Sequence, residues 1–145
     1  MALPTKLTLE IVTPDRALLR EEVDEVVVPG SQGEFGVLPG HTPMLSTLQI
    51  GELWYRQGQE KHYLAIAFGF VEVLPDRVTV LAQVGERAHE IDVQRAERAK
   101  QRAEQRLSQA SPQLTQVDFD IERARVALMK SLLRLQVASR ARTRV

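Results

Sequence analysis

Histidine and carboxylate side chains are the groups in this sequence that could do acid–base or metal chemistry, but their spacing does not support it. His41, His62 and His89 are scattered, without the i, i+4 spacing of a helical metal site or a paired carboxylate close by. The acidic run EEVDE at residues 21–25 is better interpreted as a solvated strand edge than as a metal cluster. We predict no metal site and no catalytic residue.

Motifs for nucleotide chemistry are also missing from the sequence. There is no GxGxxG dinucleotide fingerprint and no GxxxxGK[ST] phosphate loop. The absence of cysteine excludes a disulfide framework, a thiolate metal site and a cysteine nucleophile. We therefore expect the chain not to be an enzyme on its own. A small β-sandwich enzyme with its active site around His41 stays open as an alternative, and it would require that His41→Ala abolish turnover.

The sixteen residues 29–44, PGSQGEFGVLPGHTPM, contain four glycines and three prolines between two apolar segments. Glycine permits positive φ, and proline fixes φ and biases the preceding residue toward extended geometry. The stretch is therefore expected to be a firmly built loop that presents Glu34, Phe35 and His41. Such loops are either tight sheet corners or docking surfaces.

Residues 1–88 have the pattern of a β domain. Apolar and polar residues alternate from Leu7 to Ile11, and turn signals occur at Gln57–Gln59 and at Pro75–Arg77. Short strands at regular spacing predict an antiparallel β-sandwich. The expected strands are Leu7–Ile11, Val23–Val28, Leu45–Ile50, Leu53–Arg56, Tyr63–Phe70, and the segments around Val71–Val73 and Val78–Ala82.

Residues 89–145 have helical periodicity, so the fold class is α+β, with a two-helix antiparallel hairpin after the sandwich. Asp92 can cap a first helix, Ser111–Pro112 breaks the pattern, and a second helix starts near Asp118. The basic tail at 140–144 is expected to fray. The apolar sides are Ala96, Ala99, Ala103, Leu107 and Ala110 on the first helix, and Ile121, Ala124, Leu128, Leu132 and Leu135 on the second. Since alanine buries little apolar area, the hairpin should be weakly held and a modest binding energy could switch its position.

The net charge of zero hides two oppositely charged halves. Residues 1–91 hold 7 Lys/Arg and 13 Asp/Glu, whereas residues 92–145 hold 12 and 6, giving −6 and +6. The basic half is expected to bind an acidic surface, unless both faces are simply solvated. Binding of nucleic acid is a weaker alternative, because the helices lack interleaved aromatic residues. The sequence also has no apolar run of 18 residues and no signal or transit pattern, so direct membrane insertion is not expected.

The string PGSQGEFGVLPGHTPML resembles the hallmark of the epsilon subunit of F-type proton-translocating ATP synthases. The likeness continues through IDVQRAERAKQRAEQRL from Ile91 and covers nearly the whole chain. It implies a non-catalytic rotor subunit of the central stalk that couples proton flow to ATP synthesis, on the cytoplasmic face of a bacterial plasma membrane. The sandwich (1–88) would bind the gamma subunit and the c-ring, and the hairpin (89–145) would contact the beta and alpha subunits and inhibit ATP hydrolysis.

The resemblance also implies roles for particular residues. In the loop, Gly33, Glu34, Phe35 and His41 would form the rotor contacts, with Glu34 toward the c-ring and His41 toward gamma; loop shape is the competing explanation. Some members of the family bind ATP, with no other cofactor required. The residues that match their motif are Glu86, Ile91, Asp92, Arg95 and Ala96, with Lys130 and Arg134 on the second helix. An ordinary helix N-cap at Asp92 explains the first part equally well.

Overall fold

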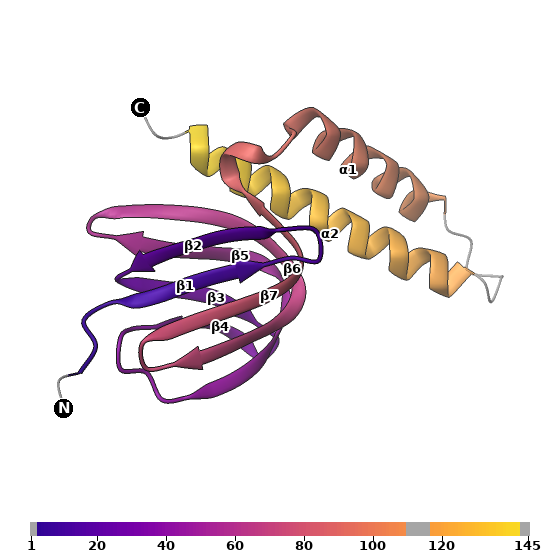
Figure 1. The fold of residues 1–145 in the computed structure, drawn as a ribbon. Coiled ribbons are helices and arrows are strands. Elements are labelled where there is room, and N and C mark those ends of the chain that lie inside the picture. Colours follow the sequence, from indigo (N-terminus) through magenta and orange to yellow (C-terminus); the bar gives the residue numbers. More distant parts are fainter. Residues whose placement is uncertain (1–2, 110–116, 143–145) are drawn as a thin grey trace. The chain divides into compact units, whose positions relative to one another are not determined.

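The computed structural model describes residues 3–109 and 117–142 (Figure 1). The chain divides into two compact units, Met1–Ala88 and His89–Val145. The first unit consists of β-strands and the second of helices. The predicted α+β class, with a β-sandwich followed by a helical hairpin, is confirmed.

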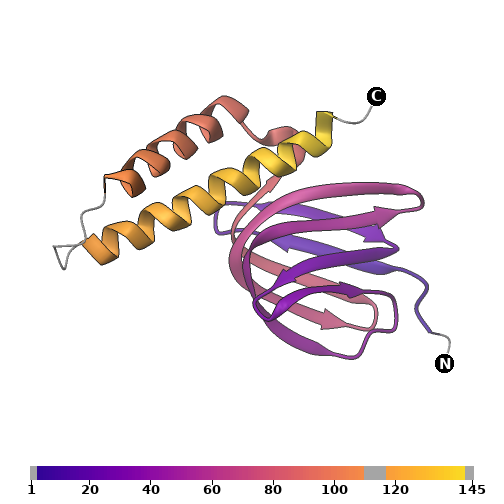
Figure 2. The same ribbon diagram turned by 180° about the vertical axis from the view of Figure 1, so that it is seen from behind.

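Seven strands of the first unit form one hydrogen-bonded sheet in the order β2-β1-β7-β6-β5-β3-β4. The two ends of the sheet curve toward each other and enclose the core (Figures 1 and 2). The strands are β1 (Leu7–Val12), β2 (Ala17–Val23), β3 (Glu25–Gly30), β4 (Gly33–Val37), β5 (Met44–Gln57), β6 (Glu60–Leu74) and β7 (Arg77–Arg87).

Aliphatic residues on the inward face of the curved sheet build the core of this unit. Along β1, Leu7, Leu9 and Ile11 are fully buried while the residues between them are partly exposed, as the alternation predicts. On β7, Val78 and Val80 continue the same pattern. Burying branched side chains contributes about 2 kcal/mol for each of them, so this core stabilises the unit.

One strand pair differs from the predicted antiparallel arrangement. β1 pairs with β7 in parallel, with Leu9 opposite Val78 and Ile11 opposite Val80. Every other strand pair is antiparallel. Alternation identifies the buried face of a strand but not its neighbour, and short turns impose antiparallel pairing only on strands consecutive in sequence.

Three further expectations about strands are wrong. β2 was not predicted, because Leu18 and Leu19 are both buried and a bulge beside it in β1 interrupts the alternation. The segments on either side of Gly51 were expected to be two strands, but they form the single strand β5. Gly51 lets Pro29 of the neighbouring strand pack closely against it, because a Cβ at residue 51 would lie 2.5 Å from the Pro29 Cβ. The stretch 29–44 is not all loop, because it contains the end of β3 and all of β4.

Ionic contacts around Asp24 join three segments at one end of the sheet. Lys6 donates to the Asp24 carboxylate, Gly58 N donates to Oδ2 at 2.7 Å, and Arg56 Nη1 lies 3.8 Å from Oδ2. The Lys6 hydrogen bond, followed by the Gly58 N–H, lowers the pKa of Asp24 below its ordinary value of 3.8. The acidic run is therefore a solvated edge at Glu21 and Glu22, as predicted, and an ion-paired corner at Asp24.

The second unit contains the short helix η1 (Ala88–Glu90, shared with the unit boundary), α1 (Val93–Ser108) and α2 (Val117–Arg142). The buried positions are Ala96 and Ala103 on α1 and Ala124, Ser131, Val137 and Ala138 on α2, and the small residues among them recur every seventh residue. Small residues at this spacing let two helices approach closely. Ala99 and Leu107 are half-buried, and the predicted Ala110 lies outside the described residues.

Two predictions about α2 need correction, one on its inward face and one on its C-terminal end. Leu132 is 46% exposed, whereas its neighbour Ser131 is buried and donates its hydroxyl proton to the Leu128 carbonyl at 2.9 Å. This internal bond satisfies the hydroxyl, so serine fits a seam that leucine would overfill. The expected fraying of the basic tail is wrong for Arg140 and Arg142, which both belong to α2, and Arg144 lies outside the described residues.

Candidate functional site

The tip of the β3–β4 hairpin presents the first predicted contact residues. Gly33 has φ of +130°, and Gly30 leaves room for the Phe35 ring, which a Cβ at residue 30 would approach to 2.9 Å. Phe35 is half-buried and packs against the core, whereas Glu34 is exposed. Gly33 and Phe35 thus shape the hairpin, and Glu34 is an exposed charged side chain on it.

The second half of the loop is held against the β6–β7 turn. Gly40 N donates to the Pro75 carbonyl at 2.7 Å, and His41 N donates to the Leu38 carbonyl at 3.2 Å. The His41 ring lies with Nδ1 2.7 Å from the Thr42 carbonyl; because a carbonyl only accepts, Nδ1 carries the proton. His41 is therefore held in one orientation with Nε2 left for other contacts.

An apolar outer face on β5, β6 and β7 was missed by the sequence analysis. It is formed by Leu45, Phe70 and Leu81, which are all exposed, and register places Phe70 opposite both Leu81 and Thr47. The sequence signal for this face was Phe70. The residues that alternate with it, Val71 and Val73, are buried, so the Phe70 side chain occupies an outward position.

A backbone kink in β6 precedes this apolar face. Phe68 has φ of +61°, and Gly69 has φ of +127°. A Cβ on Gly69 would lie 2.0 Å from the Leu81 carbonyl oxygen, so only glycine fits. A bulky residue in the left-handed region costs free energy and is found where the surrounding structure uses it. Here the kink lies directly before Phe70, which faces solvent.

The residues of the predicted ATP motif occupy the start of α1 and the end of the first unit. Asp92 is the N-cap of α1, and its Oδ1 accepts from Arg95 N at 3.1 Å. Ile91 and Ala96 are buried, and the Arg95 side chain is exposed. Glu86, half-buried on β7, belongs to the other unit. Asp92, Arg95 and Ala96 therefore lie together at the first turn of α1, and the structure shows that Asp92 caps this helix.

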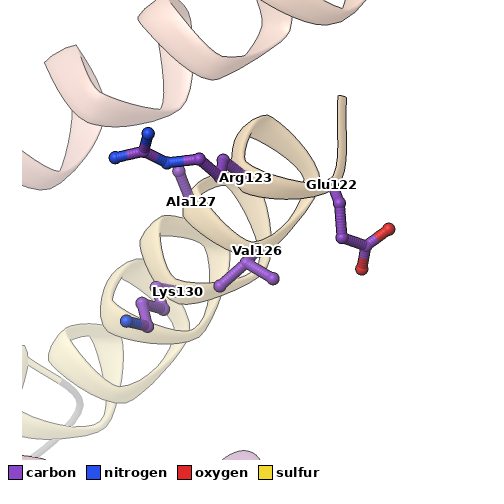
Figure 3. Close-up of a pocket in the computed structure, with 5 residues that line it drawn as sticks. All are labelled: Glu122, Arg123, Val126, Ala127 and Lys130. Atoms are coloured by element: carbon purple, nitrogen blue, oxygen red, sulfur yellow. The ribbon is translucent and has the colours of Figure 1, made fainter. Parts of the chain in front are cut away.

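Lys130 and Arg134 lie one turn apart on α2 and are both half-buried. Lys130 lines a pocket of about 360 Å³ together with Glu122, Arg123, Val126 and Ala127. Figure 3 shows Arg123 and Lys130 extending to one side of α2 and Glu122 to the other. The spacing puts Arg123 on the same side of the helix as the two predicted cations. The sequence analysis did not group Arg123 with these two cations, although the seven residues between Arg123 and Lys130 already indicated that both lie on one side of a helix.

Within residues 3–109 and 117–142, no group of three or more His, Asp or Glu could hold a metal ion. His62 stacks on Tyr55, with ring centroids 4.8 Å apart, which gives this histidine a packing role. Among the described helices, none is long and apolar enough to cross a membrane.

Two protein families match the chain, one for each unit. Residues 6–88 match the β-sandwich domain of the ATP synthase delta/epsilon chain, and residues 89–139 match its long α-helix domain. The chain is 50% identical over 135 residues to ATP synthase epsilon chain 2 of Syntrophotalea carbinolica, covering 93% of this chain and 95% of that protein. It is 51% identical to the ATP synthase epsilon chain of Syntrophobacter fumaroxidans, covering 93% and 97%.

Solved structures share the fold at lower identity. A chain of the Euglena gracilis mitochondrial ATP synthase (OSCP/F1/c-ring) superposes with a TM-score of 0.75 at 22% identity, covering 98% of this chain and 84% of that one. A chain of the Tetrahymena thermophila central stalk and c-ring gives 0.53 at 14% identity, covering 98% and 100%. The family predicted from the loop and helix motifs is confirmed: the chain belongs to the ATP synthase delta/epsilon family and is an epsilon subunit of the F-type enzyme.

Proposed function

We propose that this epsilon subunit works without catalytic residues as part of the rotor, with its first unit binding the gamma subunit and the c-ring. The observation that carries the proposal is the surface of that unit. It combines a rigid hairpin tip bearing Glu34 with an outer face bearing exposed Phe70 and Leu81. The names of the two structural neighbours, a central stalk with c-ring and an F1 with c-ring, support this assembly.

The two contacts are assigned to different residues of the loop. Exposed Glu34 is directed to the c-ring, and His41, held by Thr42, to gamma, while Gly33 and Phe35 fix the backbone between them. Glu34→Gln should weaken co-purification with the c-ring and leave gamma binding unchanged. Glu60→Gln, which removes a charge from the exposed first residue of β6, is the matched control. Equal loss of both partners, or of neither, contradicts this assignment.

The second unit is proposed to inhibit ATP hydrolysis by contacting the beta and alpha subunits. Its charge of +6 over residues 92–145 suits an acidic surface. The test adds to the catalytic head either the full chain or a truncation ending at Glu90. Both forms should bind gamma, and hydrolysis should be higher with the truncation. Unchanged hydrolysis argues against inhibition, and loss of gamma binding by both forms argues against the rotor role.

Coupling and location follow from the same proposal. A rotor subunit that joins gamma to the c-ring lets proton flow drive ATP synthesis, and it would lie peripherally on the cytoplasmic face of a bacterial membrane. Membrane vesicles depleted of the chain should lose ATP-driven proton pumping and regain it when the chain is added back. Pumping that is independent of the chain would contradict the coupling role.

We also propose ATP as a regulatory ligand of the second unit. Support comes from the open hollow on α2, whose lining includes the cationic side chains of Lys130 and Arg123. Calorimetric titration with millimolar MgATP should release heat, and Lys130→Gln should reduce it. Lys100→Gln on α1, where the ammonium contacts Glu97 and Glu104, is the control. A titration without heat removes the proposal.

A further inference from the structure

The last part of β7 extends beyond its neighbour β1 in the sheet. Register pairs Thr8–Val12 of β1 with Arg77–Leu81 of β7, and β1 ends there. β7 continues to Arg87, and residues 82–87, the overhang, pair with β6 on one edge. Among the described strands, none pairs with the other edge of the overhang. The overhang is nevertheless the stretch that carries the chain to the unit boundary at Ala88.

The turn between β1 and β2 packs against the overhang. Thr13 closes this turn, because its N–H and its hydroxyl both donate to the Arg16 carbonyl, at 2.9 and 3.2 Å. A Cβ at residue 85 would lie 3.1 Å from Leu18 Cδ2 and 3.3 Å from Thr13 Cγ2, so Gly85 lets both side chains pack on the strand. The burial of Leu18 beside the buried Leu19 follows from this contact.

Arg87 joins the end of the overhang to the same turn. Its Nη2 donates to the Leu18 carbonyl at 2.8 Å, and the contact is partly buried. The β1–β2 register skips Leu18 at the bulge, which leaves this carbonyl to a side-chain donor. Because side chains alternate along a strand, Gly85 and Arg87 share the face toward the turn, whereas Glu86 lies on the opposite face. The turn therefore holds the overhang at two positions.

We propose that Arg87 is a positioning residue that fixes the pivot between the two units at Ala88. The inference rests on the inhibitory role proposed above and adds to it the residue that sets where the second unit begins. While Arg87 binds the Leu18 carbonyl, the overhang stays part of the sheet and the second unit starts at His89.

Loss of the Arg87 contact would lengthen the connection between the units. The overhang would then be held by β6 alone, and its release would add a flexible tether of about 20 Å at about 3.3 Å per residue. A longer flexible tether lowers the effective concentration of the second unit at any surface that it contacts. Arg87 would thus act on inhibition without touching the catalytic head.

The first test measures the pivot itself and is independent of inhibition. Because the sequence contains no cysteine, Gln59→Cys and Gln101→Cys place one spin label on an exposed position of each unit. Arg87→Met, which cannot donate a hydrogen bond, should broaden the distribution of distances between the labels. It should also speed hydrogen exchange of the protected amides in residues 82–87 about tenfold, while the amides of β1 exchange as in the wild type.

Two variants serve as controls for this measurement. Arg87→Lys keeps a donor and should restore part of the narrow distance distribution and of the protection. Arg77→Met, at the exposed first residue of β7, should match the wild type. Unchanged distances and unchanged exchange in Arg87→Met overturn the proposal. Faster exchange throughout β1 as well as the overhang also overturns it, because Arg87 would then only stabilise the first unit.

The second test measures ATP hydrolysis by the head complex as a function of added chain. Arg87→Met should lower the maximal inhibition about twofold or more and leave the concentration for half effect unchanged, since the first unit still binds gamma. Full inhibition by Arg87→Met contradicts the proposal, and so does a shift in the half-effect concentration alone. If truncation at Glu90 leaves hydrolysis unchanged, the inhibitory role itself fails, and the distance and exchange measurements decide whether Arg87 fixes the pivot.

Discussion

Phe70 on β6 lies directly opposite Leu81 on β7, and the two side chains are 52% and 53% exposed. Cross-strand pairs of large apolar residues stabilise sheets when covered, but this pair faces solvent. It follows a kink that only glycine at residue 69 permits. A backbone in the left-handed region and an exposed aromatic residue therefore lie side by side on the outer face of β6.

Replacing this pair should weaken partner binding without unfolding the sheet. Phe70→Ser/Leu81→Ser is expected to lower the affinity for gamma by about 30- to 1,000-fold, because two apolar side chains that become buried at an interface contribute about 1–2 kcal/mol each. Calorimetry or co-purification measures the loss, and the urea midpoint reports folding. Leu3→Ser, at an exposed leucine outside the sheet, should change neither. Retained affinity in the double variant would mean that gamma binds elsewhere.

Gly69→Ala should destabilise the first unit by about 3 kcal/mol. The added methyl group would meet the Leu81 carbonyl oxygen at 2.0 Å, and alanine disfavours φ of +127°. Gly58→Ala is the control, since φ there is +63° with nothing within 4 Å, and it should cost about 1 kcal/mol. Urea unfolding followed by Trp54 fluorescence measures both. Similar losses for the two variants would contradict the close packing of β6 on β7.

Asp24 should make the stability of the first unit fall in acid. Its folded pKa lies below 3.8, so the unfolded state binds the proton more readily. The stabilisation is complete above pH 3.8 and is lost as the pH falls through the folded pKa. The difference in free energy of unfolding between the wild type and Asp24→Asn should therefore shrink below pH 3.8. A constant difference across that range would show that the Lys6 contact does not shift the pKa.

Asp92 offers a way to separate helix capping from nucleotide binding. Asp92→Ala removes the acceptor for Arg95 N and should destabilise the hairpin by about 1 kcal/mol, measured by circular dichroism on heating. Asp92→Asn keeps a capping oxygen and should preserve helix stability. If ATP binds through the carboxylate, the asparagine variant will lose the calorimetric signal while remaining folded. Equal ATP binding by Asp92→Asn and the wild type would leave Asp92 with its capping role alone.

The sequence by itself determined the family, the division into a β-strand unit and a helical unit, and the buried face of most strands and helices. Alternation in β1 and the spacing of Ala96 and Ala103 are local patterns, which the chain shows whatever it contacts. The Asp92 cap and the turn at Gly58 could be predicted for the same reason, because neighbouring residues form them.

The tertiary structure alone decided which distant segments became neighbours. The parallel β1–β7 pair, the contact of Lys6 and Arg56 with Asp24, and the placement of Phe70 beside Leu81 join residues far apart in sequence. Likewise, Ser131 is buried in the seam of α2 and the predicted Leu132 is not, because the distance between the helices, rather than hydrophobicity, sets which side chain fits there. Periodicity determines which side of an element is buried, whereas packing of the whole chain determines what covers it and which apolar residues remain uncovered.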